Sequence, residues 1–374
     1  MTKNKDYRLK PYRRRNRTYK QAVALGARRS RRSRIIASQN ARDRRARITQ
    51  DTFHIILTTH GYYEEVPDDN GCSAGPSGIY HDLSGPILRS REGSSFYQHM
   101  SALLGTWRDG PRLSVRDVDP LTTIPSSSSS LSSVSTTRFE YVTLSTLAAA
   151  RQVWLSNPLL QFRKSGLGVL NDALPKKPGG SSLTGGGLHE ECLVRQSTLF
   201  DSLQNSSAGS SFYSEHRIES DRSGFHDHSM LYSPSVVVFK DDAGHCIPPF
   251  TIGVVSCVPV NAGTVRVRFN ISDEEKYSGI RRVMEDRMGR ILRLFEERGD
   301  QILILNAFGV GQFGNSPDMV GEIWADLLGT KDAKFYGVFE KVIFAVPGKY
   351  LRALENSFAA KVLEAELLAA TLDE

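Results

Sequence analysis

The sequence predicts an α/β protein in which a sheet carries helices on both faces, over about residues 140–374. One observation is a series of short β-branched apolar runs, which are typical of strands buried on both faces. Helix-like segments alternate with these runs, and this alternation indicates three layers. The runs are GLGVLN (166–171), SVVVF (235–239), TIGVVSCV (251–258), ILILNAF (302–308) and VIFAV (342–346).

The predicted helices each have their own signal. Residues 142–154 are rich in Ala and Leu. Ser272 begins a capping box with Glu275, and apolar residues then recur every three or four positions. Pro317 opens another helix, since proline is tolerated in a first turn. An apolar stripe over 351–363 predicts that the chain ends in a helix docked on the body.

Three further segments precede this domain. Residues 1–34 form a basic tail with too few apolar side chains to fold alone. Residues 35–121 form an accessory region of helix and loop, with a basic helix over 35–57 and a surface hairpin around 77–85. In residues 122–137, 12 of 16 positions are Ser or Thr, which indicates a linker or insertion. The α/β domain itself is expected over 138–374.

Positive charge is concentrated at the amino terminus. The whole chain has a formal charge of +7, but residues 1–50 hold 18 Lys and Arg against two acidic residues, a balance of +16. The remaining residues hold 30 basic and 39 acidic side chains, a balance of −9. The arginine clusters within 1–34 indicate a nuclear-import signal that binds an import receptor, or a contact with nucleic acid. A solvated tail remains the alternative.

Several classes of protein are disfavoured. The longest apolar stretch, 252–260, is about half of the roughly 20 residues that span a bilayer, so no contact with a membrane is expected. No apolar segment follows the basic amino terminus, which argues against a secretory signal. The four cysteines include no CxxC pair, which argues against a disulfide framework or a structural zinc site. The sequence therefore predicts a nuclear or cytoplasmic protein.

Two glycine-rich segments follow predicted strands, where α/β sheets place ligand sites. They are PGGSSLTGGGLHEEC (178–192) and NAFGVGQFGN (306–315). Glycines let the backbone approach a ligand and turn N–H groups toward an anion, so the two loops together could hold a diphosphate. Each segment could instead be an ordinary strand-to-helix turn.

Glu190 and Glu191 begin a predicted helix beside the first glycine loop. Consecutive helical side chains point about 100° apart, so one carboxylate could hold a substrate while its neighbour carries out proton chemistry. A neighbouring diphosphate would raise the pKa of a glutamate here toward the range of a general acid. The alternative is that acidic residues in a first turn stabilise the helix dipole.

The segment VLNDALPKKPGGSSLTGGGLHEECLVRQSTLF (169–200) resembles the signature of the microbial-type poly(ADP-ribose) glycohydrolases, in which VLNxAxxxxPGGG is followed after a short spacer by QEE. The resemblance continues, in the family's order, through 229–244, 256–263, 287–315 and 342–348. It covers roughly residues 35–350. The resemblance implies a macrodomain-like mixed sheet with flanking helices, extended by the N-terminal helix and the basic tail.

The resemblance also implies an ADP-ribose pocket. Glu191 would be the catalytic acid and base, and Glu190 would hydrogen-bond the terminal ribose. The implied substrate contacts are Gly179, Gly180, Ser181 and His189 in the first loop, and Gly309, Val310, Gly311, Gln312 and Phe313 in the second, with Phe313 packing on the substrate ribose.

The implied activity is hydrolysis of the ribose–ribose O-glycosidic bonds of poly(ADP-ribose), without a metal or cofactor. Glu191 would protonate the departing 2′-oxygen and then activate water. The implied partner is the polymer or an ADP-ribosylated protein.

Three positions depart from the family motif. Ser181 stands at its third glycine, His189 at its glutamine, and Leu174 where the family commonly shows Asn or Ser. Leu174 cannot hydrogen-bond a ribose hydroxyl, and a lost anchor lowers rate more than binding. Two alternatives therefore stay open: a catalytically weakened module that binds ADP-ribose, and a hydrolase of mono-ADP-ribose.

Overall fold

The computed structural model describes residues 36–67, 73–109, 136–157, 160, 166–218 and 222–372. The predicted basic tail lies outside the described residues, as does the Ser/Thr-rich segment except for its last two positions.

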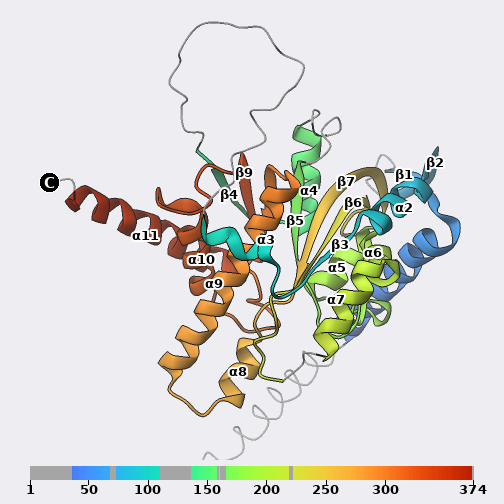
Figure 1. Cartoon of the computed structure of the whole chain (residues 1–374). Helices are drawn as coiled ribbons and strands as arrows, with labels where there is room; N and C mark the ends of the chain where they lie inside the picture. Colours follow the sequence, from blue (N-terminus) through green and yellow to red (C-terminus); the bar gives the residue numbers. More distant parts are fainter. Residues whose placement is uncertain are drawn as a thin grey trace, which may run out of the picture.

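A seven-stranded sheet forms the middle layer (Figure 1). Its five strands from β7 to β4 run parallel, while β6 pairs antiparallel with β7 and β3 pairs antiparallel with β6. The predicted mixed sheet is therefore confirmed. The strand order is β3 (Ser95–Tyr97), β6 (Met230–Lys240), β7 (Cys246–Cys257), β5 (Leu167–Asp172), β8 (Ile302–Leu305), β9 (Lys341–Ala345) and β4 (Arg138–Val142).

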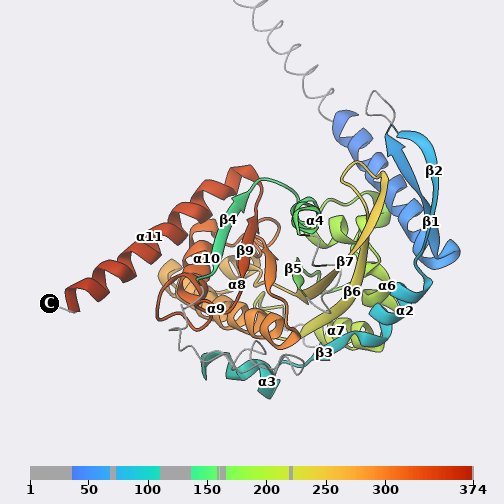
Figure 2. The ribbon, with the colours of Figure 1, turned by 90° about the horizontal axis from the view of Figure 1, so that it is seen from above.

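Helices cover both faces of the sheet, so the predicted three layers are confirmed (Figure 2). One face carries the helix over 36–54, α2 (Ser84–Gly93), α4 (Thr146–Ser156), α5 (His189–Gln196), α6 (Leu199–Asn205) and α7 (Ser207–Ile218). The other carries α3 (Ala102–Gly105), α8 (Ala262–Arg268), α9 (Asp273–Arg298), α10 (Pro317–Trp324) and α11 (Gly348–Leu372).

The strands contribute side chains to two apolar cores, one on each face. In β5, Val169 packs in the first core and its neighbour Leu170 in the second. In β7, Val254 and Val255 divide in the same way. Successive strand residues point to opposite faces, and this explains why these strands are apolar at almost every position.

The predicted elements are present, with shifted ends. The helix predicted from 142 begins at Thr146, because Val142 is the last residue of β4 and pairs with β9. The strand predicted over 302–308 ends at Leu305, where the second glycine loop begins. The capping box of α9 forms as predicted, with Ser272 N donating to Glu275 at 2.9 Å. The surface hairpin is β1 (Gly61–Pro67) with β2 (Ser73–Asp82).

Across the described ranges, none of the helices has the length and apolar character needed to cross a membrane. Within the same ranges, His, Cys, Asp and Glu side chains form no cluster of three or more that could hold a metal ion.

Two glycines of α9 give a matched test of this packing. A methyl group on Gly289 would lie 2.4–2.7 Å from the Trp107 ring, which is held by a 3.0 Å bond from its Nε1 to Asp286. We expect Gly289→Ala to lower the free energy of unfolding by about 1–3 kcal/mol through overpacking. Urea denaturation measures the change.

Gly279 is the control, because its added methyl would have its nearest contact at 3.8 Å from Phe225. Gly279→Ala should raise the stability by up to about 1 kcal/mol, the ordinary gain in a helix. Equal effects of the two substitutions would contradict this account.

Candidate active site

A cavity of about 460 Å³ opens at the carboxyl edge of the sheet, where β5, β8, β9 and β4 end. This volume is within the range of small-molecule sites. Its lining comes from the turns after these strands and from α5. The lining includes Thr146, Asp172, Leu174, Leu188, His189, Asn306, Val310, Gly311, Gln312, Phe313 and Lys349.

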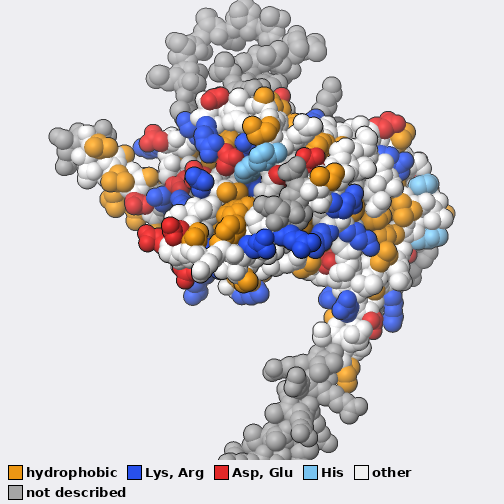
Figure 3. Space-filling model, turned by 60° about the horizontal axis from the view of Figure 1, so that its bottom comes forward, with side chains coloured by type: hydrophobic (Ala, Val, Ile, Leu, Met, Phe, Trp, Pro, Cys, Tyr) orange, Lys and Arg blue, Asp and Glu red, His pale blue; other side chains and the backbone are white. Residues whose placement is uncertain are grey.

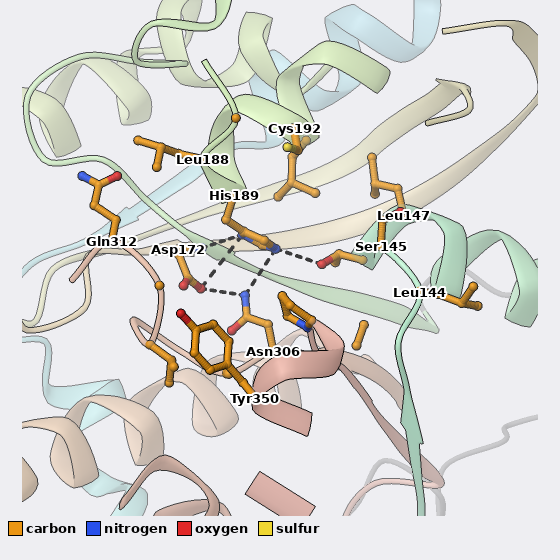
Figure 4. Close-up of a pocket in the computed structure, with 18 of the residues that line it drawn as sticks. Leu144, Ser145, Leu147, Asp172, Leu188, His189, Cys192, Asn306, Gln312 and Tyr350 are labelled. Atoms are coloured by element: carbon orange, nitrogen blue, oxygen red, sulfur yellow. Dashed lines mark hydrogen bonds and ion pairs between the residues drawn. The ribbon is translucent and has the colours of Figure 1, made fainter. Parts of the chain in front are cut away.

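A polar network forms one wall of the cavity. Figure 4 shows Asp172, His189 and Asn306 turned toward one another there. The Asn306 amide donates to Asp172 Oδ1 at 2.6 Å. His189 Nδ1 accepts from the backbone N–H of Asp172 at 3.2 Å, so the neutral ring carries its proton on Nε2 and donates to Thr146 Oγ1 at 2.9 Å. The sequence interpretation did not include Asp172, Thr146 or Asn306.

Burial sets the protonation of this wall. Desolvation raises the pKa of the Asp172 carboxyl, although the His189 ring and the hydrogen bonds from Gly309 and Asn306 act the other way. Desolvation also lowers the pKa of His189. Both shifts favour uncharged side chains, because the charged forms lose hydration there.

Glu190 is fully buried and holds the start of the glycine loop. Its carboxylate accepts hydrogen bonds from Gly179 N at 2.7 Å, Leu174 N at 3.0 Å and the Tyr213 hydroxyl at 3.1 Å. Burial raises the pKa of Glu190 to about 7, and these donors limit the rise. Burial is thus the cause of the raised pKa of Glu190 in this structure, and the predicted effect of a neighbouring diphosphate remains a prediction.

Glu191 lies behind the same loop, with 1% of its surface exposed. It accepts from Ser181 N at 2.8 Å, from Ser181 Oγ at 2.7 Å and from Leu188 N at 2.8 Å. A Cβ atom at Gly180 or Gly186 would lie 2.7 or 2.2 Å from its carboxylate oxygens. Both glycines are therefore required for the loop to close around Glu191.

Ser181 fits this loop without strain. Its φ is −102°, outside the left-handed region that favours glycine, whereas Gly179 and Gly180 have φ of +64° and +52°. The serine thus replaces the third glycine of the motif at a position that tolerates a side chain. Its hydroxyl adds a donor to Glu191 that glycine lacks.

Three guanidinium groups hold the outside of the loop. Arg42 Nε donates to Thr184 O at 2.7 Å, and Arg45 Nε donates to Gly185 O at 2.8 Å. Arg195 of α5 donates to the next carbonyl, that of Gly186. The helix over 36–54 is thus attached to the loop that encloses Glu191.

The second glycine loop is tied to the wall of the cavity. Gly309 N donates to Asp172 Oδ2 at 2.9 Å, and Gly309 itself has a φ of +72°. The N–H groups of Gly311, Gln312 and Phe313 have no hydrogen-bond partner among the described residues. These three amides border the cavity and are available to an anion.

The structure divides the predicted site residues into two groups. His189, Val310, Gly311, Gln312 and Phe313 line the cavity. Gly179, Gly180, Ser181, Glu190 and Glu191 lie behind its wall, and the amides of Gly179 and Ser181 point to the two glutamates. Gly309 contributes its amide to Asp172.

Leu174 lies between these two groups of residues. Leu174 lines the cavity. A Cβ atom added to Gly180 would lie 2.3 Å from Leu174 Cδ1 and 2.7 Å from Glu191 Oε1, so both side chains approach the same point. The leucine side chain therefore stands close to the Glu191 carboxylate on the cavity side.

The chain matches a family described as "Microbial-type PARG, catalytic domain" over residues 69–241. Its fold is similar to that of poly(ADP-ribose) glycohydrolase (PARG) from Thermomonospora curvata, with 28% identity and a TM-score of 0.65 over 85% of this chain and 98% of that one. A second structure of that enzyme holds the inhibitor ADP-HPD, with 27% identity, a TM-score of 0.64 and the same coverage.

The poly(ADP-ribose) glycohydrolase from Deinococcus radiodurans, in complex with ADP-ribose, is 27% identical, with a TM-score of 0.57 over 76% of this chain and 99% of that one. No curated protein was found to match the chain.

The arginine contacts predict how the loop depends on the N-terminal helix. Arg45→Ala removes the donor to Gly185 O. We expect backbone amides of 181–187 to exchange hydrogen about tenfold faster, since a hydrogen bond to a charged group contributes about 1.5 kcal/mol. Hydrogen-exchange mass spectrometry measures the rate.

Arg44→Ala is the matched control, because Arg44 donates at 3.0 Å to Ala243 O, between β6 and β7. It should leave exchange in 181–187 unchanged. Equal acceleration by both variants would assign the effect to the helix as a whole.

Proposed function

We propose that this chain belongs to the microbial-type poly(ADP-ribose) glycohydrolase family, hydrolyses ribose–ribose O-glycosidic bonds of poly(ADP-ribose) and releases ADP-ribose. The family match and the likeness to solved glycohydrolases confirm the resemblance seen in the sequence. The observation that carries the mechanism is a buried Glu191 carboxylate held by a glycine loop beside a cavity of suitable size.

The cavity offers ADP-ribose a site for its diphosphate. The free amides of Gly311, Gln312 and Phe313 supply donors, and Lys349 on the lining supplies a positive charge. Burial raises the pKa of Asp172, and this shift toward the neutral acid lessens its repulsion of a phosphate. Phe313 lines the same space and would pack on a ribose.

Glu191 is the proposed acid and base. It donates its proton to the departing 2′-oxygen as the bond to C1″ breaks, and an oxocarbenium-like centre develops. Water then adds to C1″ and returns a proton to the carboxylate. The approach to Glu191 passes Leu174, so the substrate must displace that side chain or Glu191 must turn toward the cavity.

The predicted contact of Glu190 with the terminal ribose remains a proposal. In this structure its carboxylate accepts from Gly179, Leu174 and Tyr213. These bonds support a second task, which is to fix the entry of the glycine loop.

A module that binds ADP-ribose without cleaving it is the second candidate. It is favoured by one observation: neither glutamate lines the cavity, whereas Leu174 does. A hydrolase of mono-ADP-ribose would use the same glutamate with another leaving group, and the substrate assay below separates it.

Glu191→Gln should lower kcat for release of ADP-ribose from purified polymer by at least about 100-fold, because the general acid is lost. ADP-ribose binding, measured by calorimetry, should change little, since Glu191 does not line the cavity. Glu274→Gln, at an exposed first-turn position of α9, is the control and should keep full activity.

The wild-type protein separates the candidates. Tight ADP-ribose binding with no release from polymer or from ADP-ribosylated protein would establish the binding module. Release only from mono-ADP-ribosylated protein would establish the third candidate. Absence of both binding and release would refute the proposed function.

Leu174→Asn should raise kcat/KM by about tenfold, because an amide opens the approach to Glu191 and adds a hydrogen bond worth about 1 kcal/mol. Leu174→Ala is the matched control: it opens the same space without the hydrogen bond and should give a smaller gain. Steady-state kinetics on polymer measure both. A loss of activity in both variants would show that the leucine supports the site rather than obstructs it.

A further inference from the structure

Basic side chains gather at the carboxyl edge of the sheet, although residues 51–374 carry a net charge of −9. Figure 3 turns the lower side of Figure 1, where α8 lies, toward the viewer and shows Lys and Arg in a band across this face. We define this basic band by six exposed residues: Lys176 and Lys177 after β5, Arg217 at the end of α7, Arg222 before β6, and Arg266 and Arg268 in α8.

All six residues lie at the edge on which the cavity opens. Lys176 and Lys177 directly precede the first glycine loop. Arg266 donates to Gly314 O at 2.8 Å, in the second glycine loop. Arg217 is in the last turn of α7, and Arg222 lies in the connection that leads to Met230. Met230 begins β6 and pairs with Cys257, the last residue of β7. The band therefore runs beside both loops of the proposed site.

The charges of the band are not neutralised by ion pairs within the described structure. None of the six forms a salt bridge with another described residue. Like charges on one face repel one another, at a cost that a bound polyanion would remove. A run of positive charge beside the mouth of the cavity, on a body with a net negative charge, is arranged to attract an anionic chain there.

We propose that the basic band binds the diphosphates of the poly(ADP-ribose) units that adjoin the unit held in the cavity. This inference rests on the proposed function. The polymer carries two phosphates in each unit, and the proposed function places one unit in the cavity of about 460 Å³. The adjoining units would leave across the carboxyl edge, where Lys side chains contact phosphates as point charges and Arg side chains donate paired hydrogen bonds to them.

The test uses the full chain, so that the basic tail is present in every variant. Two double variants are tested. One carries Lys176→Glu and Lys177→Glu, and the other carries Arg217→Glu and Arg222→Glu. The matched control is Lys331→Glu with Lys334→Glu, two exposed lysines before β9, at the opposite edge of the sheet. Binding of long poly(ADP-ribose), of free ADP-ribose and of single-stranded RNA is measured at several salt concentrations.

Each band variant should bind the polymer at least about tenfold more weakly, and the slope of log K against log salt should fall by about 1.4 for two lost phosphate contacts. Affinity for free ADP-ribose should stay within about twofold, because one unit in the cavity does not reach the band. The control should retain the wild-type polymer affinity.

Three outcomes would overturn the inference. If the band variants bind the polymer as tightly as the control does, the basic band is not a binding surface for the polymer. An equal loss of affinity for free ADP-ribose would place the effect in the cavity. A loss for single-stranded RNA without a loss for the polymer would assign the band to nucleic acid. A wild-type protein that binds neither ADP-ribose nor polymer refutes the proposed function itself, which is a separate result.

Discussion

Two buried carboxylates determine the shape of the proposed active site. The glycine loop after β5 folds around Glu190 and Glu191, and its amides at 179, 181 and 188 donate to them. A buried carboxylate without donors is strongly unfavourable, and a loop whose amides lack acceptors is unfavourable for the same reason. The conformation of the loop and the positions of the two acids therefore stabilise each other.

The peptide groups of this loop form hydrogen bonds on both sides of the loop. Their N–H groups point inward to the carboxylates, while the carbonyls of 184–186 point outward to Arg42, Arg45 and Arg195. The helix that carries Arg42 and Arg45 is anchored in turn, because Thr52 donates to Arg195 O at 2.6 Å. The N-terminal extension is thus part of the architecture that holds Glu191, although it lies far from it in the sequence.

The sequence predicted the elements better than the site. Apolar runs identified five strands because both faces of the sheet are buried, whereas β4 was missed because its five residues alternate in exposure and β3 because it has three residues. The loop glycines pointed to the right edge of the sheet. The sequence did not show that neither glutamate lines the cavity, because this depends on how the glycine loop, with Gly179 and Gly180 at positive φ, folds around the two carboxylates.

The polar wall of the cavity was not predicted from the sequence, although the sequence contains a signal for it. Asp172 ends β5 and Asn306 follows β8, and polar residues at such positions face the ligand edge of a parallel sheet. Their partnership with His189 joins three segments that are distant in the chain. Only the strand order, which places β5 beside β8, brings these residues together.

Electrostatics then explains how an acidic site can accept an anionic ligand. An ionised carboxylate about 4 Å from a phosphate would cost about 4 kcal/mol at an effective dielectric constant near 20. Burial raises the pKa of Asp172, and it raises the pKa of Glu190 to about 7, so both shifts favour the uncharged carboxyl group. Lys349 on the lining and the basic band at the rim add positive charge without entering the buried wall. The carboxyl groups close to the ligand and the basic groups that attract a polyanion over a long range therefore lie in different parts of the structure.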